Sequence, residues 1–115
     1  LSDDNGNQVI ELDVEVNGKT QQLRGEGNGP ISAILDALQL PIDVLSYEER
    51  SIGSGAHAKA LALIELQVKG TGRSAFGAGI HDNIVTSSIE AIIACTNRLI
   101  EQGVLSTDQL VAAAV

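Results

Sequence analysis

The sequence is poor in aromatic, cysteine and basic residues, and each shortage argues against a class of protein. Among 115 residues, Tyr47 and Phe76 are the only aromatic ones, so the core must consist of Ile, Leu, Val and Ala. Cys95 is the single cysteine, which rules out an intrachain disulfide and favours a reducing compartment. Only seven Lys and Arg, scattered along the chain, oppose 15 Asp and Glu. The net charge of -8 therefore argues against DNA, RNA or an anionic membrane as partner.

Long apolar runs are also missing. No segment approaches the ~20 apolar residues that a membrane span requires, and no basic segment followed by an apolar one indicates a secretion signal. We therefore expect a soluble protein, and its 115 residues favour a single domain. The first residues, LSDDNGNQ, lack an initiator Met and are polar and rich in turn formers. They predict a fragment of a longer protein, with residues 1–7 as the remnant of a linker.

The first forty residues predict a hairpin followed by a helix. Residues 9–16 alternate between apolar and acidic side chains, as in a half-buried strand. Asn17-Gly18 is the preferred pair for a two-residue hairpin turn, so residues 19–27 are predicted to return as the partner strand. In residues 30–38 the apolar side chains have helical spacing, with Asn28 as the expected N-cap and Pro30 in the first turn.

The rest of the chain predicts three more strands and a long helix. Residues 42–52 alternate loosely, and residues 58–69 favour a strand narrowly over a helix. After the turn Gly70-Thr71-Gly72, residues 73–79 form the next predicted strand. Asp82 or Asn83 is then expected to cap a helix that ends at Gly103. Residues 104–115 contain the capping-box pattern Ser106-x-x-Gln109 and are predicted to form a helical tail.

The two halves of the chain repeat one pattern. Gly-x-Gly precedes each helix, with Gly25 and Gly27 matching Gly77 and Gly79, and ISAILDAL matches VTSSIEAI position by position. The repeat predicts an α+β fold of two pseudo-symmetric units, each a β-hairpin or small sheet plus a helix, that is, βββα-like. A phosphate loop is normally a single site, so repeated glycines favour a backbone requirement, either close approach or positive φ.

Catalytic chemistry finds little support. GSGAHA at residues 53–58 fits one form of the dinucleotide fingerprint, but a strand is predicted where that motif requires a helix. The histidines His57 and His81 lack metal-ligand spacing, and Cys95 has no basic neighbour that would activate it. The equivalent acids Asp36 and Glu90 are best explained as solvated helix positions. The small residues from Ser51 to Ala62 leave room for a compact apolar ligand or a second subunit, unless they reflect ordinary packing.

Three stretches carry a family resemblance: VNGKTQQLRGEGNGPISAILDAL, VLSYEERSIGSGAHAKALALIEL and FGAGIHDNIVTSSIEAIIACTNRL. In this order they resemble the C-terminal regulatory domain of 2-isopropylmalate synthase, with residues 8–103 as the sensing domain. The resemblance implies a homodimer that binds L-leucine near the dimer interface and inhibits leucine biosynthesis by feedback. It further implies a separate catalytic TIM barrel that condenses acetyl-CoA with 2-oxoisovalerate using a divalent metal. No cofactor is expected in this domain. The expected compartment is the cytoplasm, or a plastid or mitochondrial matrix in a eukaryote.

The resemblance also assigns an effector pocket by position. Its residues are Val44, Tyr47, Ser51, Gly55, Ala58 and Ala60, with Ile80 or Ile84 as a further apolar wall. Small alanines leave volume for a branched side chain, and the ligand carboxylate is expected at helix N–H groups near Asn28-Gly29 or Asp82-Asn83. The sequence does not select a partner for the ligand ammonium.

Two other functions stay open at this stage. One is the regulatory domain of citramalate synthase, which has the same domain type and binds isoleucine. The other is a purely structural dimerisation domain without a ligand. An independent enzyme ranks behind both, because the sequence offers no catalytic constellation.

Overall fold

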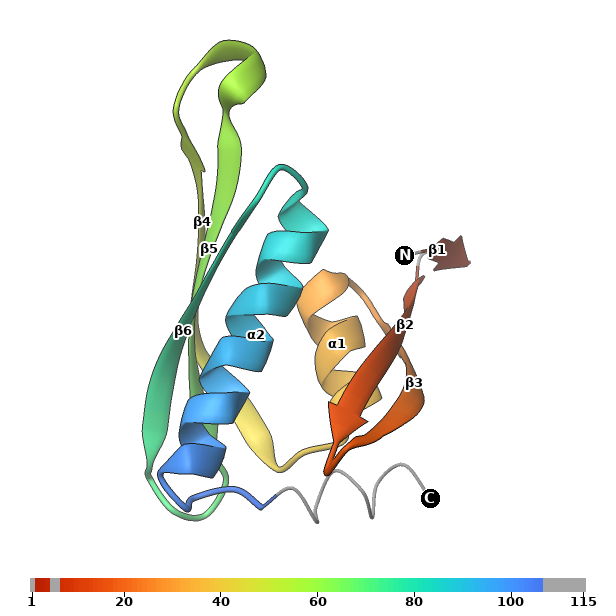
Figure 1. Cartoon of the computed structure of the whole chain (residues 1–115), viewed down its shortest axis with the longest axis vertical. Helices are drawn as coiled ribbons and strands as arrows, with labels where there is room; N and C mark the ends of the chain where they lie inside the picture. Colours follow the sequence, from red (N-terminus) through yellow and green to blue (C-terminus); the bar gives the residue numbers. More distant parts are fainter. Residues whose placement is uncertain (1, 5–6, 107–115) are drawn as a thin grey trace. The chain divides into compact units, whose positions relative to one another are not determined.

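The computed structural model describes residues 2–4 and 7–106, which form two compact units divided after Leu40 (Figure 1). Each unit contains a three-stranded antiparallel sheet followed by one helix. The predicted α+β class and the two βββα-like units are thereby confirmed. None of the helices in the described part of the chain has the length and apolar character needed to cross a membrane.

The first unit contains the predicted hairpin. Strands β2 (Asn7–Val16) and β3 (Lys19–Gly27) pair with Leu12 opposite Leu23. Asn17 and Gly18 make the turn with φ of 53° and 80°, as a two-residue hairpin of this type requires. A short strand β1 (Ser2–Asp4) pairs with β2, inside the stretch that the sequence predicts to be a linker.

Helix α1 (Pro30–Leu38) packs Ala33, Ile34, Ala37 and Leu38 into the core of this unit. The prediction that Asn28 caps it was wrong. Gly29 occupies the N-cap in an extended conformation, and no side chain bonds to the first turn. Because Pro30 is the first helical residue, the side chain of Asn28 lies one position too early to act as a cap.

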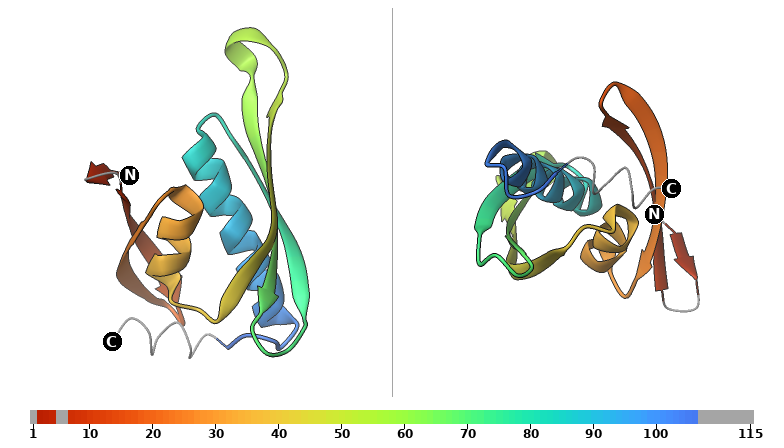
Figure 2. Two further views of the ribbon diagram at one scale, coloured as in Figure 1. Left: turned by 180° about the vertical axis from the view of Figure 1, so that it is seen from behind. Right: turned by 90° about the horizontal axis from the view of Figure 1, so that it is seen from below.

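The second unit is built around a long hairpin. Strand β4 (Ile42–Ile52) leads through a short 3₁₀ turn, η1 (Gly55–His57), into β5 (Lys59–Val68), which pairs in turn with β6 (Ser74–His81). The ambiguous segment 58–69 is thus a strand, and its alternate residues Ala62, Ile64, Leu66 and Val68 are buried. The far end of the β4–β5 hairpin projects beyond the first turn of the following helix (Figures 1 and 2).

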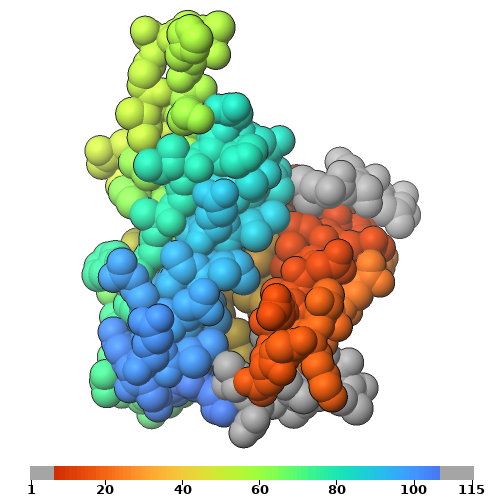
Figure 3. Space-filling view, viewed as in Figure 1, coloured from red at the N-terminus to blue at the C-terminus, as the bar shows by residue number. Residues whose placement is uncertain are grey.

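Helix α2 (Ile84–Glu101) covers β5 and β6 and buries Ala91, Ile92, Cys95 and Leu99. Asn83 caps it, as predicted, because its Oδ1 accepts from the N–H groups of Val85 at 2.8 Å and Thr86 at 3.3 Å. Gly103 follows the helix at a φ of 75°. Of the predicted tail at 104–115, residues 107–115 lie outside the described residues. Figure 3 shows the projecting hairpin, in yellow-green, extending past the turquoise start of α2.

The repeated glycines allow close approach of helix and sheet. A Cβ on Gly25 would lie 2.8 Å from the Cα of Ala37, and a Cβ on Gly79 would lie 2.8 Å from the backbone nitrogen of Ala91. Neither glycine has a positive φ. The lack of room for a side chain, and not the backbone conformation, therefore explains why glycine occupies these positions. The structure also corrects the predicted pairing, because Gly25 corresponds to Gly79. The hypothetical Cβ of each meets a carbonyl oxygen in the equivalent helical turn, that of Ala33 or Ser87.

We therefore expect Gly79→Ala to destabilise the protein by about 1–3 kcal/mol or more, because the added methyl group collides with helix backbone that cannot rotate away. Gly29→Ser is the matched control, since nothing lies within 4 Å of the added group and Ser is a good N-cap. Urea unfolding followed by circular dichroism measures both. Equal midpoints for Gly79→Ala and the parent protein would contradict the close-approach explanation.

Candidate ligand-binding site

A hollow of about 380 Å³ lies between the projecting hairpin and the start of α2. Its volume falls within the range of pockets that hold small molecules. It is lined by Glu49, Arg50, Ser51, Ala58, Lys59, Ala60, Asp82 and Ile84. Four of the residues assigned from the sequence, Ser51, Ala58, Ala60 and Ile84, therefore line one hollow.

The apolar part of this hollow comes from small side chains on neighbouring elements. Ser51 of β4 lies directly opposite Ala60 of β5, and Ala58 precedes β5 by one residue. Ile84 is the first residue of α2 and contributes a branched side chain. The hollow exists because α2 begins short of the hairpin end, where the alanines are too small to fill the remaining space.

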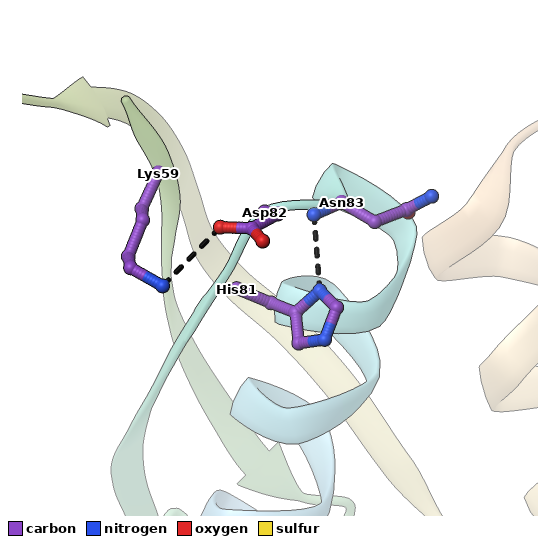
Figure 4. Close-up of polar contacts among 4 residues, drawn as sticks. All are labelled: Lys59, His81, Asp82 and Asn83. Atoms are coloured by element: carbon purple, nitrogen blue, oxygen red, sulfur yellow. Dashed lines mark hydrogen bonds and ion pairs between the residues drawn. The ribbon is translucent and has the colours of Figure 1, made fainter. Parts of the chain in front are cut away.

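The charged groups around the hollow are mostly paired. Arg50 forms an ion pair with Glu48 at 2.7 Å, and Lys59 forms one with Asp82 at 3.2 Å (Figure 4). Glu49 forms no ion pair within residues 2–4 and 7–106. Its carboxylate accepts a hydrogen bond from the hydroxyl of Tyr47. The hollow therefore contains one carboxylate whose charge no nearby cation neutralises.

Tyr47 connects β4 to α2. Its hydroxyl lies 2.7 Å from Oγ of Ser88, a buried residue one turn into the helix. Burial first, and then the hydrogen bond to Glu49, raise the pKa of Tyr47 from 10.0 to about 12, while the Ser88 hydrogen bond lowers it. The phenol therefore stays protonated and able to donate at neutral pH.

The N-terminus of α2 is already occupied by the protein's own acceptors. The N–H of Asn83 donates to Nδ1 of His81 at 3.0 Å (Figure 4). The Asn83 side chain accepts from the N–H groups of Val85 and Thr86. The Asn83 carbonyl accepts from Ser87 at 3.0 Å. The sequence predicted that N–H groups near Asp82-Asn83 receive a ligand carboxylate. A carboxylate would have to displace these internal acceptors.

The remaining residues of the sequence-based assignment do not line this hollow. Tyr47 lines a second hollow, while Val44 and Ile80 have exposed side chains on β4 and β6. Gly55 lies in the turn at the hairpin tip with a φ of 64°. Asn28 and Gly29 belong to the first unit, whereas all residues of the hollow belong to the second.

Sequence reasoning missed Glu49, although the sequence contained a signal for it. Residues i, i+2 and i+4 of a strand point to the same face, so Tyr47, Glu49 and Ser51 share one face of β4. The pairing of these residues with Ile64, Ala62 and Ala60 identifies that face as the one covered by α2. Glu49 could thus have been assigned with its two neighbours.

The second hollow, of about 500 Å³, is lined by nine residues: Ser46, Tyr47, Glu48, Leu63, Ile64, Phe76, Gly77, Ala78 and Arg98. It borders the sheet face that points away from α2. There Phe76 is 62% exposed and Ile80 is 53% exposed. Leu61 and Leu63 lie opposite Ile80 and Ala78 on the same face. In the first unit, the face of β2 and β3 opposite α1 instead contains Glu11, Asp13, Glu15 and Arg24.

The structure gives no support for a metal site or a reactive thiol in the described part of the chain. Residues 2–4 and 7–106 contain no group of three His, Cys, Asp or Glu placed to hold a metal ion. Cys95 is fully buried, its thiol donates to the Ala75 carbonyl at 3.0 Å, and burial raises its pKa. Asp36 accepts from the N–H of Glu26 at 2.8 Å, so this acid connects the last turn of α1 to β3.

Comparison with known proteins gives a consistent family. Residues 1–100 match the model of the LeuA allosteric (dimerisation) domain. The chain is 49% identical over 102 residues to a 2-isopropylmalate synthase from Azoarcus sp. (strain BH72), covering 89% of this chain and 18% of that protein. It is 41% identical over 102 residues to the 2-isopropylmalate synthase of Pseudomonas savastanoi pv. phaseolicola (strain 1448A / Race 6), with the same coverage. The chain thus spans less than a fifth of the length of these relatives.

The environment of Tyr47 yields a pH prediction. Folding raises the pKa of Tyr47 from 10.0 to about 12, so the protonated phenol contributes to the stability of the folded state. This contribution is fully present below pH 10 and is lost as the pH rises toward 12. Tyr47 is the only tyrosine and the chain has no tryptophan, so ultraviolet absorbance of tyrosinate reports on it alone. We expect a titration midpoint near 12 for the folded protein and near 10 in urea. A folded midpoint near 10 would mean that the hydroxyl is not held by Glu49 and Ser88.

Proposed function

The chain belongs to the family of LeuA allosteric (dimerisation) domains, and we propose that it is the regulatory domain of a 2-isopropylmalate synthase that binds L-leucine as feedback inhibitor. The observation that carries this proposal is the hollow lined by Ser51, Ala58, Ala60 and Ile84. Alanines on the strand and a branched residue on the helix leave an apolar space suited to a branched aliphatic side chain. Charged groups border this space, as a zwitterionic ligand requires.

Inhibition requires that leucine binds one state of the enzyme better than another. A tenfold preference corresponds to about 1.4 kcal/mol, and equal affinity for both states would shift nothing. The hollow has a structural basis for such a preference, because β4, β5 and α2 each provide part of its lining. A ligand that contacts all three elements favours the arrangement in which they lie at the right distances.

The catalytic part of the enzyme lies outside this chain in our proposal. The named relatives are roughly five times as long as this chain, since the 102 matched residues are 18% of their length. We propose that the parent chain condenses acetyl-CoA with 2-oxoisovalerate in an N-terminal TIM barrel, and that any divalent metal belongs to that barrel. The relatives are bacterial, which favours the cytoplasm as the compartment.

Leucine is the preferred ligand over isoleucine because the relatives are named 2-isopropylmalate synthases, not citramalate synthases. The two amino acids differ in where the side chain branches. A pocket discriminates such isomers by shape, which contributes about 1–3 kcal/mol. Isoleucine therefore serves as the competing ligand in the binding experiment.

We also propose that the domain functions as a homodimer, and that the sheet face opposite α2 in the second unit forms its interface. Large apolar residues, Phe76 and Ile80 among them, are exposed there. Glu48 and Arg50 border them on β4, so a two-fold axis can place each of these charges near its opposite in the second copy. Exposed large apolar residues bordered by charges are unusual on a surface that faces water, but they are typical of an isologous interface.

The leucine site is tested with Ala60→Val. Valine suits a β-strand, so folding should be retained while two added methyl groups occupy the hollow. We expect leucine affinity, measured by titration calorimetry, to fall by about tenfold or more, in line with the ~1–3 kcal/mol cost of overpacking. Thr20→Val on the exposed face of β3, in the first unit, is the control and should bind leucine like the parent protein.

Two outcomes would reject this site. Unchanged affinity in Ala60→Val would place the leucine site elsewhere. A folded parent protein that releases no heat with leucine or isoleucine would favour a purely structural dimerisation domain.

The interface is tested with Phe76→Glu, which puts a charge in place of the most exposed large apolar side chain on this face. We expect the parent protein to sediment as a dimer and the variant as a monomer at the same concentration, with unchanged circular dichroism. Thr20→Glu on the exposed face of β3 is the control. A variant that remains dimeric would show that the second copy docks on another surface.

A further inference from the structure

The proposed leucine site lacks an assigned partner for the ligand's ammonium group, and the charges around the hollow can be compared for this role. An ammonium needs acceptor oxygens, and a carboxylate gives the strongest hydrogen bonds to it. The lining contains two carboxylates, those of Glu49 and Asp82. Asp82 is neutralised by Lys59 at 3.2 Å, whereas Glu49 forms no ion pair in the described part of the chain. Glu49 is thus the lining group with an uncompensated charge.

The position of Glu49 also suits this role. It shares the α2-covered face of β4 with Ser51, and it lies opposite Ala62, two residues along β5 from Ala60. If the aliphatic side chain of the ligand packs against Ala58 and Ala60, the polar end of the ligand lies within reach of β4. Arg50 also lines the hollow, but its guanidinium pairs with Glu48 at 2.7 Å and forms no ion pair with Glu49 in the described part of the chain.

Tyr47 fixes the direction of this carboxylate. Its hydroxyl donates to Oε1 of Glu49 and lies 2.7 Å from Ser88 on α2. A carboxylate has about four lone-pair sites, so one bond from Tyr47 leaves capacity for an ammonium. Because the tyrosine ring is anchored at the helix, the Glu49 side chain is held at the hollow instead of moving freely in solvent.

The same contacts connect the hollow to the first turn of the helix. Ser88 lies 2.9 Å from the carbonyl of Ile84 as well as 2.7 Å from the Tyr47 hydroxyl. A serine hydroxyl carries a single proton, so it can donate to only one of these two oxygens at a time. The proton of Tyr47 is committed to Glu49, which leaves Ser88 as donor in the Tyr47 contact. Glu49 is therefore connected through Tyr47 to Ser88 on α2.

We propose that the carboxylate of Glu49 receives the ammonium group of the bound amino acid, and that Tyr47 is a positioning residue that holds this carboxylate toward the hollow. The assignment rests on the proposed leucine site and adds its charge specificity. It selects α-amino acids over branched carboxylic acids of the same shape, because those acids lack the cation that Glu49 requires.

Titration calorimetry on the 115-residue chain tests this assignment with L-leucine and with 4-methylpentanoate, which lacks only the amino group. For Glu49→Gln we expect leucine affinity to fall by about tenfold or more, as expected when a charge-assisted bond is lost. Affinity for 4-methylpentanoate should change by less than about twofold. Glu49→Asp retains the charge and should recover part of the leucine affinity. Glu90→Gln makes the same chemical change on the exposed side of α2 and should bind leucine like the parent.

Tyr47→Phe separates positioning from packing. It keeps the aromatic ring and removes the hydroxyl, so leucine affinity should fall by a smaller factor than in Glu49→Gln. Its affinity for 4-methylpentanoate should stay unchanged. A loss shared equally by both ligands would instead show that Tyr47 supports the shape of the site.

The outcomes distinguish this inference from the proposed function. If the parent protein binds leucine and Glu49→Gln binds it equally well, Glu49 is not the ammonium partner, while the leucine site stands. If Glu49→Gln weakens both ligands equally, or Glu49→Asp is as weak as Glu49→Gln, the carboxylate does not act through the ligand's charge. If the folded parent binds no leucine, the proposed function fails and the role of Glu49 fails with it.

Discussion

The structure depends on direct contact between the backbone of a strand and the backbone of the helix that covers it, with no side chain between them. At Gly25 and Gly79 a strand approaches its helix so closely that even a methyl group would collide with helical carbonyl and amide groups. This contact fixes the depth and the longitudinal position of each helix on its sheet. Small residues are then required on the facing helical turns, where Ala33, Ala37, Ser87 and Ala91 lie. The low aromatic content follows, because a layer this thin has no room for large rings.

The position of α2 on its sheet determines where the hollow forms. With the helix held at Gly77 and Gly79, its first residue is Ile84, while β4 and β5 continue toward the turn at Gly55–His57. The strand surface beyond the helix consists of alanines and serine, which do not fill the space. In the first unit the equivalent first strand, β1, has three residues, against 11 in β4. The same βββα pattern thus lacks the long wall that Glu49 and Ser51 provide in the second unit.

The sequence predicted most of this fold because its signals are local. Strict alternation in residues 9–16, the Asn17-Gly18 turn and the Asn83 cap each depend on neighbouring residues alone. The N-cap at Gly29 and the pairing of Gly25 with Gly79 depend on how helix and sheet meet, which spacing along the chain does not encode. The site shows the same division. The small residues at 51, 58 and 60 form a visible pattern, whereas the importance of Glu49 follows from the ion pairs that its neighbours form.

The projecting hairpin is the part of the second unit with the least support, and this bears on how a small ligand could act. Its residues beyond α2 are exposed and lack helix contacts, so their local stability is low compared with that of the buried strand segments. A ligand bound between this hairpin and Ile84 would stabilise that arrangement by about 2.7 kcal/mol at a concentration of 100 times its Kd. Because Tyr47 already joins β4 to Ser88, the ligand would add to an existing connection between hairpin and helix. An element of low local stability, joined to the start of α2 by the Tyr47–Ser88 and Lys59–Asp82 contacts, is therefore a place where a modest binding energy shifts the conformational population.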